Sequence, residues 1–300
     1  MNAESNCLYT PGCVSALVTN EAELPLWLGR TNAPQQVTLN FPSARAAAEH
    51  GERRDLPHAL EQLYDTAVAY AGERLPQRAA HRHVVVDAPA PEGELQPGVF
   101  YKRLLELVRP SHVVLVAARD AAHETVPGQG SWTSYLQEDV QRLLPDCEFV
   151  FVPPQARPCP QSTRPLLLLE YFVGTPLAPL GCSKVVVPLS GAGLQCCSLT
   201  ATVGADGTVA VQRVQPDRSW RGLVCALSHA ETLEEVPLAP VAGQFAVIDV
   251  DEASEEMVVI VPAGEEPLQR RLVIVPRAAE SDSLRLTEVQ IAQLEESVAV

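Results

Sequence analysis

The side chains best suited to phosphate chemistry in this sequence are two lysines and one aspartate. Lys102 and Lys184 are the only lysines, and Asp87 follows the apolar run Val84–Val86. Phosphates are usually held by a glycine-rich loop between a strand and a helix, with a lysine in that loop. Neither lysine follows such a loop, and the string Gly-x-x-x-x-Gly-Lys-Ser/Thr is absent from the sequence. We therefore interpret Asp87 as the cap of a loop, with a Mg²⁺-binding carboxylate as the alternative.

Histidine, cysteine and glycine patterns offer no other chemistry. His81 and His83 supply too few ligands for a closed metal site, and the eight cysteines include no CxxC pair. We expect the cysteines to be reduced thiols, mostly in the core. The fragment Gly191-Ala192-Gly193 is the nearest approach to a dinucleotide fingerprint and predicts a turn at a strand edge. The sequence therefore predicts no catalytic residue and no metal site.

Composition limits the classes of function further. The chain has 300 residues and a net charge of −15, from 22 Lys and Arg residues against 37 Asp and Glu residues. The length corresponds to about two domains. Because nucleic-acid affinity comes mainly from cations that neutralise phosphates, free-standing nucleic-acid binding is disfavoured. No apolar run reaches about eighteen residues and no signal peptide is visible, so we expect an intracellular protein without a membrane span.

Residues 1–180 are predicted to form an α/β domain. Apolar residues recur at helical spacing in three segments, 57–75, 99–109 and 131–144, with Ser131 as an expected N-cap. Three apolar runs between and after them predict buried strands, namely Val84–Val86, Val113–Val116 and Phe149–Val152. Val14–Thr19 and Val37–Phe41 are further strand candidates, and 153–165 is predicted to be a loop. Buried strands separated by single helices are typical of a parallel sheet covered on both faces.

The sequence after residue 180 predicts strands joined by short turns. Residues 181–278 are expected to form a β-rich domain with six strands, at Val185–Val187, Leu199–Val203, Val209–Val214, Phe245–Val250, Met257–Val261 and Leu272–Val275. Ala205-Asp206-Gly207 predicts a hairpin turn. Residues 279–300 are expected to carry an acidic amphipathic helix, which begins at a capping box of Thr287 and Gln290. Its apolar side is predicted to hold Val289, Leu294 and Val298.

Four strings, in this order along the chain, resemble one known family. They are Leu8–Leu17, the segment Leu28–Pro34, the string Glu170-Tyr171-Phe172-Val173-Gly174, and the pattern that runs from Val241 to Ile274. The first is similar to the family's segment just after the Walker B strand, and the third is similar to the end of its lid helix. The fourth is similar to the closing pattern of its C-terminal domain. The family is the Clp-type polyribonucleotide 5′-hydroxyl kinase and pre-mRNA cleavage complex II subunit.

The resemblance implies a fold and a set of site residues. The fold is α/β, a partial P-loop (RecA-like) parallel sheet with flanking helices, followed by a smaller β-rich C-terminal domain. Thr31 and Asn32 match the stretch near which the family holds RNA, although a polar turn before Pro34 is the favoured alternative. Arg164, Glu170 and Tyr171 are the expected remnant of the lid.

The sequence departs from the family pattern where the family does its chemistry. Family members carry an N-terminal β domain and an ATP-binding loop ahead of the position that matches Met1, so we expect this chain to lack both. The lid helix contains Pro165 and four leucines, Leu166–Leu169, where arginines are expected. Leucines cannot neutralise the charge that develops on a transferring phosphoryl group. No cofactor is therefore expected, and binding of ATP and Mg²⁺ is expected only if the missing N-terminal half exists.

Together these features predict a non-catalytic scaffold subunit of the nuclear pre-mRNA 3′-end cleavage and polyadenylation machinery. The expected partners are cleavage and polyadenylation factor subunits, or a tRNA-splicing complex, with weak or indirect RNA contact and no membrane. The alternatives are a fragment of an active polynucleotide kinase and an unrelated α/β protein. We expect the partner to cover an exposed hydrophobic edge of the parallel sheet, which the missing half leaves open. The terminal helix is expected to dock on its own domain, with partner binding as the alternative.

Overall fold

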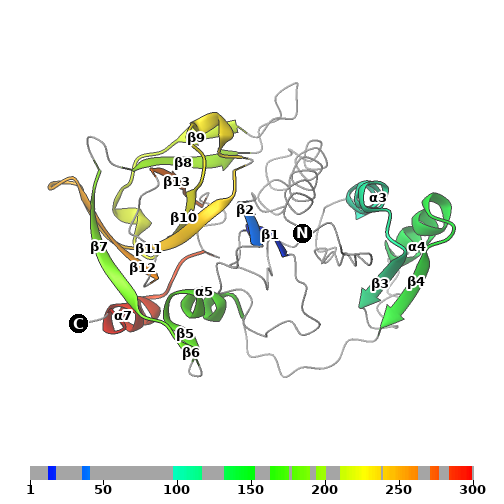
Figure 1. Cartoon of the computed structure of the whole chain (residues 1–300), viewed down its shortest axis with the longest axis horizontal. Helices are drawn as coiled ribbons and strands as arrows, with labels where there is room; N and C mark the ends of the chain where they lie inside the picture. The colour runs from blue at the N-terminus through cyan, green and yellow to red at the C-terminus, as the bar shows by residue number, and fades with distance from the viewer. Residues whose placement is uncertain are drawn as a thin grey trace, which may run out of the picture.

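The computed structural model describes the chain in segments. They are residues 13–17, 36–40, 97–116, 132–152, 163–175, 178–189, 194–200, 210–237, 239–262, 271–276 and 284–298. Figure 1 shows these elements coloured along the chain. Several predicted features lie outside the described residues, namely the helix at 57–75, the strand Val84–Val86, Asp87, His81, His83, the Ser131 cap, Gly191-Ala192-Gly193 and the turn Ala205-Asp206-Gly207.

A helix–strand–helix–strand unit follows the predicted α/β pattern. It consists of α3 (Pro97–Val108), β3 (His112–Val116), α4 (Trp132–Leu143) and β4 (Glu148–Val152). β3 and β4 pair in parallel, so α4 is the crossover between them, which confirms the predicted parallel arrangement. Apolar side chains of α3 and α4 meet the strands in a small core built around three buried residues, Leu105, Leu136 and Val140.

The prediction that these strands are buried on both faces is wrong for β3 and for the end of β4, where Phe151 and Val152 are 40% and 38% exposed. Val114 and Val116 are 58% and 63% exposed, whereas Val113 packs against α3 and α4. In the described part of the chain, β3 and β4 pair only with each other, and both helices lie on one face. An unbroken apolar run shows that a strand is apolar on both sides, but it does not show that both sides are covered.

The two early strand candidates form a hairpin-like pair. β1 (Cys13–Leu17) and β2 (Gln36–Asn40) are antiparallel, with Cys13 opposite Asn40 and Leu17 opposite Gln36. The strands are therefore confirmed. Their pairing differs from the parallel arrangement of β3 and β4, and the described residues show no hydrogen-bonded link between the two pairs.

The largest described sheet is C-terminal and has seven strands in the order β7-β12-β11-β10-β13-β8-β9. The strands are β7 (Cys182–Pro188), β8 (Gln195–Thr200), β9 (Ala210–Arg213), β10 (Val224–Ser228), β11 (Val241–Asp251), β12 (Glu256–Pro262) and β13 (Leu272–Ile274). All neighbours are antiparallel except β13 and β8. Five of the six predicted strands are confirmed. The strand predicted at Leu199–Val203 overlaps β8 only at Leu199 and Thr200, and the central strand β10 was not predicted. This C-terminal sheet is the largest of the described sheets, and the relative size of the two predicted domains stays a prediction.

Two helices cover one face of this sheet (Figure 1). α5 (Thr163–Val173) and α7 (Glu288–Glu296) contact each other, and α5 also contacts β12. Alternate residues of β11 separate two cores: Ala246 faces the helices, and Phe245 faces the opposite side. A short two-stranded link, β5 (Gly174–Thr175) with β6 (Ala178–Pro179), connects α5 to β7. None of the helices in the described segments is long and apolar enough to cross a lipid bilayer.

The terminal helix begins as the sequence predicted. The Thr287 side chain accepts a hydrogen bond from the backbone N–H of Gln290, and the Gln290 side chain accepts one from the backbone N–H of Thr287. The predicted apolar side is partly wrong. Val289 is 69% exposed, whereas Ile291 and Leu294 are buried in the core under α5. The helix docks on its own domain, in agreement with the favoured expectation.

Candidate interaction surface

The structure places the predicted site residues in two different situations. Thr31 and Asn32 lie outside the described residues. Arg164, Glu170 and Tyr171 all lie on α5, but Arg164 is in the first turn, about 9 Å along the helix axis from Glu170. Glu170 is half-buried and Tyr171 is buried. The three residues therefore share a helix without meeting at one point.

Tyr171 fastens α5 to the sheet. Its hydroxyl oxygen accepts a hydrogen bond from the backbone N–H of Gln244 on β11, at 2.9 Å. Its ring meets that of Phe172 edge to face, with 5.1 Å between the centroids. The helix ends one residue before Gly174, whose φ of +74° is the left-handed conformation that closes many helices. This end of the predicted lid is thus held in the C-terminal core.

Leu168 and Leu169 of α5 have a structural role. Leu168 and Phe172 are fully buried and pack in one core with Ile260 of β12 and Leu294 of α7. Leu168, Tyr171 and Phe172 follow the i, i+3, i+4 spacing of a buried helix face. That spacing is visible in the sequence and predicts the buried face of the helix.

The most extensive exposed apolar feature described lies on β3 and β4. Residues opposite each other in a parallel pair share a face, so Val114 with Val150 and Val116 with Val152 form one valine face. The helices α3 and α4 occupy the other face. Val114, Val116 and Val152 are 58%, 63% and 38% exposed. Parallel sheets are normally covered on both faces, so this valine face is a candidate protein-binding surface.

A polar pair borders the valine face at the start of both strands. His112 of β3 and Glu148 of β4 are opposite each other, with 3.4 Å between Nε2 and Oε2. The Ser111 hydroxyl lies 2.9 Å from Nδ1 of the same imidazole. An apolar centre with a polar border is the usual composition of a protein interface.

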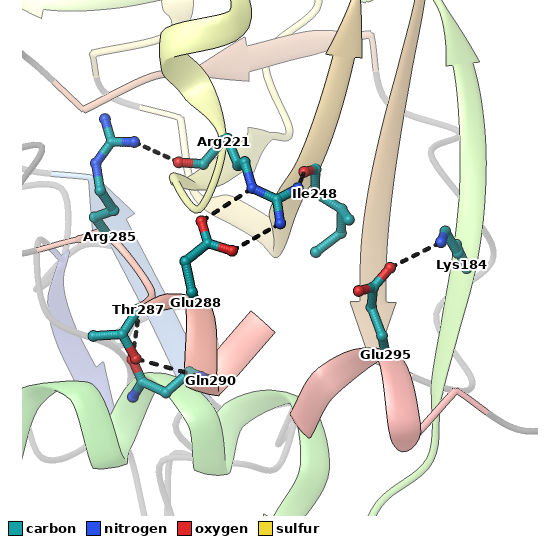
Figure 2. Close-up of polar contacts among 8 residues, drawn as sticks. All are labelled: Lys184, Arg221, Ile248, Arg285, Thr287, Glu288, Gln290 and Glu295. Carbon is teal, nitrogen blue, oxygen red and sulfur yellow. Dashed lines mark hydrogen bonds and ion pairs between the residues drawn. The ribbon is translucent and has the colours of Figure 1, made fainter. Parts of the chain in front are cut away.

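The C-terminal segment is attached to the sheet by charged side chains (Figure 2). The Arg221 guanidinium donates to both carboxylate oxygens of Glu288, at 3.0 and 2.8 Å, and to the Ile248 carbonyl at 2.6 Å. Arg285 in turn donates to the Arg221 carbonyl. Lys184 of β7 and Glu295 of α7 form an ion pair at 3.0 Å. The hydrogen bonds from Arg221 hold the pKa of Glu288 below its usual value.

The described cysteines are placed for packing. Cys196, Cys197 and Cys225 are buried in the sheet, and burial raises the thiol pKa of Cys196 to about 12 and of Cys197 to about 11. Such thiols are poor nucleophiles and poor metal ligands because the thiolate is scarce. Within the described segments, no three His, Cys, Asp or Glu side chains cluster as a metal site would require.

Comparison with known proteins supports a shared fold. No family model and no curated protein matches the sequence. A structure that reports an extended interface between Pcf11p and Clp1p, and the basis of ATP loss in a point mutant, matches with a TM-score of 0.68 and 16% identity over 92% of this chain. The wild-type Clp1p–Pcf11p complex matches with a TM-score of 0.67 and 18% identity, also over 92%. The chain spans 65% of each matched chain, less than two thirds. The fold is therefore like that of Clp1p.

Proposed function

We propose that this chain is a non-catalytic, protein-binding subunit of the nuclear pre-mRNA 3′-end cleavage and polyadenylation machinery. The observation that carries the proposal is the Clp1p-like fold over 92% of the chain, in neighbours that were solved as complexes with Pcf11p. Fold alone does not fix function, so the argument also needs a surface with suitable chemistry. The valine face supplies one.

The valine face favours a protein partner over a nucleic acid. Its exposed residues are apolar, and the chain carries a net charge of −15, so it has little to offer a phosphate backbone. Direct RNA contact is accordingly weak in this proposal, with Thr31 and Asn32 as its only candidates. Replacement of both by Ala is expected to leave RNA retention by the assembled complex unchanged if the contact is indirect.

Two features argue against phosphoryl transfer by this chain. The sequence contains no Walker A string, and Leu168 of α5 is fully buried in the C-terminal core, with Leu169 packed against that core. A kinase lid must instead present cations to the transferring phosphoryl group. We therefore assign no cofactor, and Arg164, Glu170 and Tyr171 have no catalytic role in the proposal.

A second candidate function is part of an ATP-dependent polynucleotide 5′-hydroxyl kinase. It is favoured by one observation: the chain spans only 65% of each Clp1p structure it matches, and one of those structures concerns ATP loss. In that case ATP and Mg²⁺ bind to sequence that is not present in these 300 residues. This second candidate therefore predicts that the endogenous protein yields peptides from additional sequence, outside these 300 residues, that contains an ATP-binding loop.

Affinity purification of the tagged protein from nuclei of its own cells, followed by mass spectrometry, tests both candidates. The scaffold function predicts cleavage and polyadenylation subunits, and the same preparation carrying Val114→Glu and Val116→Glu is expected to lose them. Gln141→Glu, on the exposed side of α4, adds a charge elsewhere on the same unit and is the matched control. Recovery of tRNA-splicing subunits alone, or equal recovery with the double variant, would contradict the proposal. Peptides that contain a phosphate loop would favour the kinase.

A further inference from the structure

Within the described residues, the outer edge of the seven-stranded sheet at β7 has outward-facing backbone groups without a partner strand. β7 is the terminal strand of the sheet and pairs with β12 on one side. In the described residues, the outer side of β7 has one further backbone pairing, a parallel bridge between Cys182 and Val298. Beyond this bridge the strand continues for six residues to Pro188.

The register shows which residues point outward. The Leu189 N–H donates to the Glu255 carbonyl at 2.8 Å, so this pair is hydrogen bonded, and hydrogen-bonded pairs alternate along an antiparallel ladder. Val187 and Val185 therefore bond to β12, whereas the backbone groups of Lys184 and Val186 face away from it. Pro188 fits this assignment, because proline lacks a backbone N–H and an outward position needs no N–H to bond to β12.

Side chains on the same residues make this edge suitable for a partner strand. Val186 is 55% exposed, although its neighbour across the ladder, Val258, packs against the helix-covered core. Lysine on an edge strand normally discourages strand addition. Here the Lys184 ammonium is 3.0 Å from Glu295 of α7, so its charge is balanced and its side chain is directed to the helix (Figure 2).

The charge around the edge selects the partner. Glu256 is exposed opposite Pro188, and Glu255 is exposed opposite Leu189. Glu295 and Glu296 are exposed on α7 near the start of β7. Lys184 is paired with Glu295, and within the described residues no ion pair neutralises Glu255, Glu256 or Glu296, so the edge is acidic at both ends. A second copy of the chain, itself at −15, would be repelled.

We propose that β7 is a docking edge for a basic, extended segment of a partner protein, which adds to the sheet as a further strand. The segment bonds to the outward N–H and C=O groups of Lys184 and Val186. It places an apolar side chain beside Val186 and Arg or Lys residues towards Glu256 and Glu296. This inference does not depend on the proposed function, because neither the valine face nor the identity of the complex enters it.

The probe for the test is a fluorescein-labelled synthetic peptide of about nine residues in which arginine and valine alternate, a typical strand length. Binding to the full chain is measured by fluorescence anisotropy, and amide hydrogen exchange is measured with and without peptide. The expected result is saturable binding with new protection of the Lys184 and Val186 amides. Protection at other amides only, or equal binding of a glutamate–valine peptide, would overturn the proposal.

A matched pair of variants tests the role of the backbone. Val186→Pro removes an outward N–H without removing a bond to β12, and it is expected to weaken peptide binding about tenfold. Val186→Thr keeps the N–H and the β-branched shape, and it is expected to change binding by less than about twofold. Equal binding by the folded proline variant would contradict strand addition.

A charge variant covers the case in which Val186→Pro does not fold. The double change Glu256→Gln and Glu296→Gln leaves the backbone intact and is expected to weaken binding about threefold to fivefold, with a smaller salt dependence. Glu234→Gln is the control, because Glu234 is an exposed acid on the 3₁₀ turn Leu233–Glu235, beside the β8–β13 part of the sheet. An equal effect of the control would show that net charge alone drives binding. Concentration-dependent protection without peptide would instead identify a second copy as the occupant.

Discussion

Arg221 and Glu288 are 67 residues apart in the sequence and form a two-pronged ion pair that fixes the first turn of α7 to the end of the 3₁₀ turn Arg218–Trp220. The hydrogen bonds between the two side chains raise the pKa of Arg221 and lower the pKa of Glu288. Because Arg221 also donates to the Ile248 carbonyl, the helix is tied to β11 through one side chain.

Replacement of Glu288 by Gln is expected to lower the melting temperature at pH 7 by a few degrees at most, because the pair is exposed. The folded pKa of Glu288 lies below its usual value of 4.5. Its contribution is therefore complete above pH 4.5 and is lost as the pH falls through the lower, folded value. Melting curves of the wild type and variant should converge under acid. Glu296→Gln, on the same helix, is the control, and an equal loss there would contradict the assignment.

Gly222→Ala is expected to destabilise the C-terminal sheet by about 2 kcal/mol or more, from left-handed strain and a steric clash. Gly222 has a φ of +81°, and an added Cβ would lie 2.8 Å from the Leu286 carbonyl oxygen. The Leu286 N–H also donates to the Gly222 carbonyl, so the two segments are held in close contact at this point. Urea denaturation measures the loss. Gly181→Ala, at an exposed glycine without a positive φ, should be close to neutral.

Tyr171→Phe is expected to cost about 1–3 kcal/mol, the cost of leaving the buried Gln244 N–H without its acceptor. The measurement is the free energy of unfolding in urea. Because the bond uses the main chain of Gln244, Gln244→Ala should leave the effect of Tyr171→Phe unchanged. An effect of Tyr171→Phe that disappears in the Gln244→Ala background would show that the side chains carry the interaction instead.

The buried cysteines should resist alkylation in the folded protein. With thiol pKa values of about 12 for Cys196 and about 11 for Cys197, the thiolate is rare at pH 8. Iodoacetamide is expected to modify both at least about a hundredfold more slowly in buffer than in urea, as measured by mass spectrometry. Half-buried Cys147 should show a smaller difference between the two conditions. Fast labelling of Cys196 in buffer would mean that the β8 region opens readily.

Apolar patterns predicted most described elements, since α3, α4, β3, β4 and five strands of the large sheet lie where the sequence placed them, whereas β8 begins four residues before its predicted start. The missed strand β10 has the sequence Val-Cys-Ala-Leu-Ser, which contains few β-branched residues and no alternation. It is a strand because β11 and β13 bond to both of its sides. A local pattern does not contain that information.

The surfaces were harder to predict than the elements. Val289 and Leu294 are five residues apart and lie on different sides of an α-helix, whereas Ile291 and Leu294 are three apart and share the buried side. For β3, the sequence contains no sign that one face lacks a cover. The outward direction of Lys184 and Val186 depends on the register with β12, which only the folded sheet defines.

The position of Leu294 has a consequence for synthesis of the protein. This residue is fully buried among side chains of α5 and the sheet, and Cys182 donates to its carbonyl across 112 residues. The helix-covered core therefore stays incomplete on the ribosome until α7 has emerged from the exit tunnel. Until then, the apolar side chains beneath α7 are exposed to chaperones and to neighbouring nascent chains.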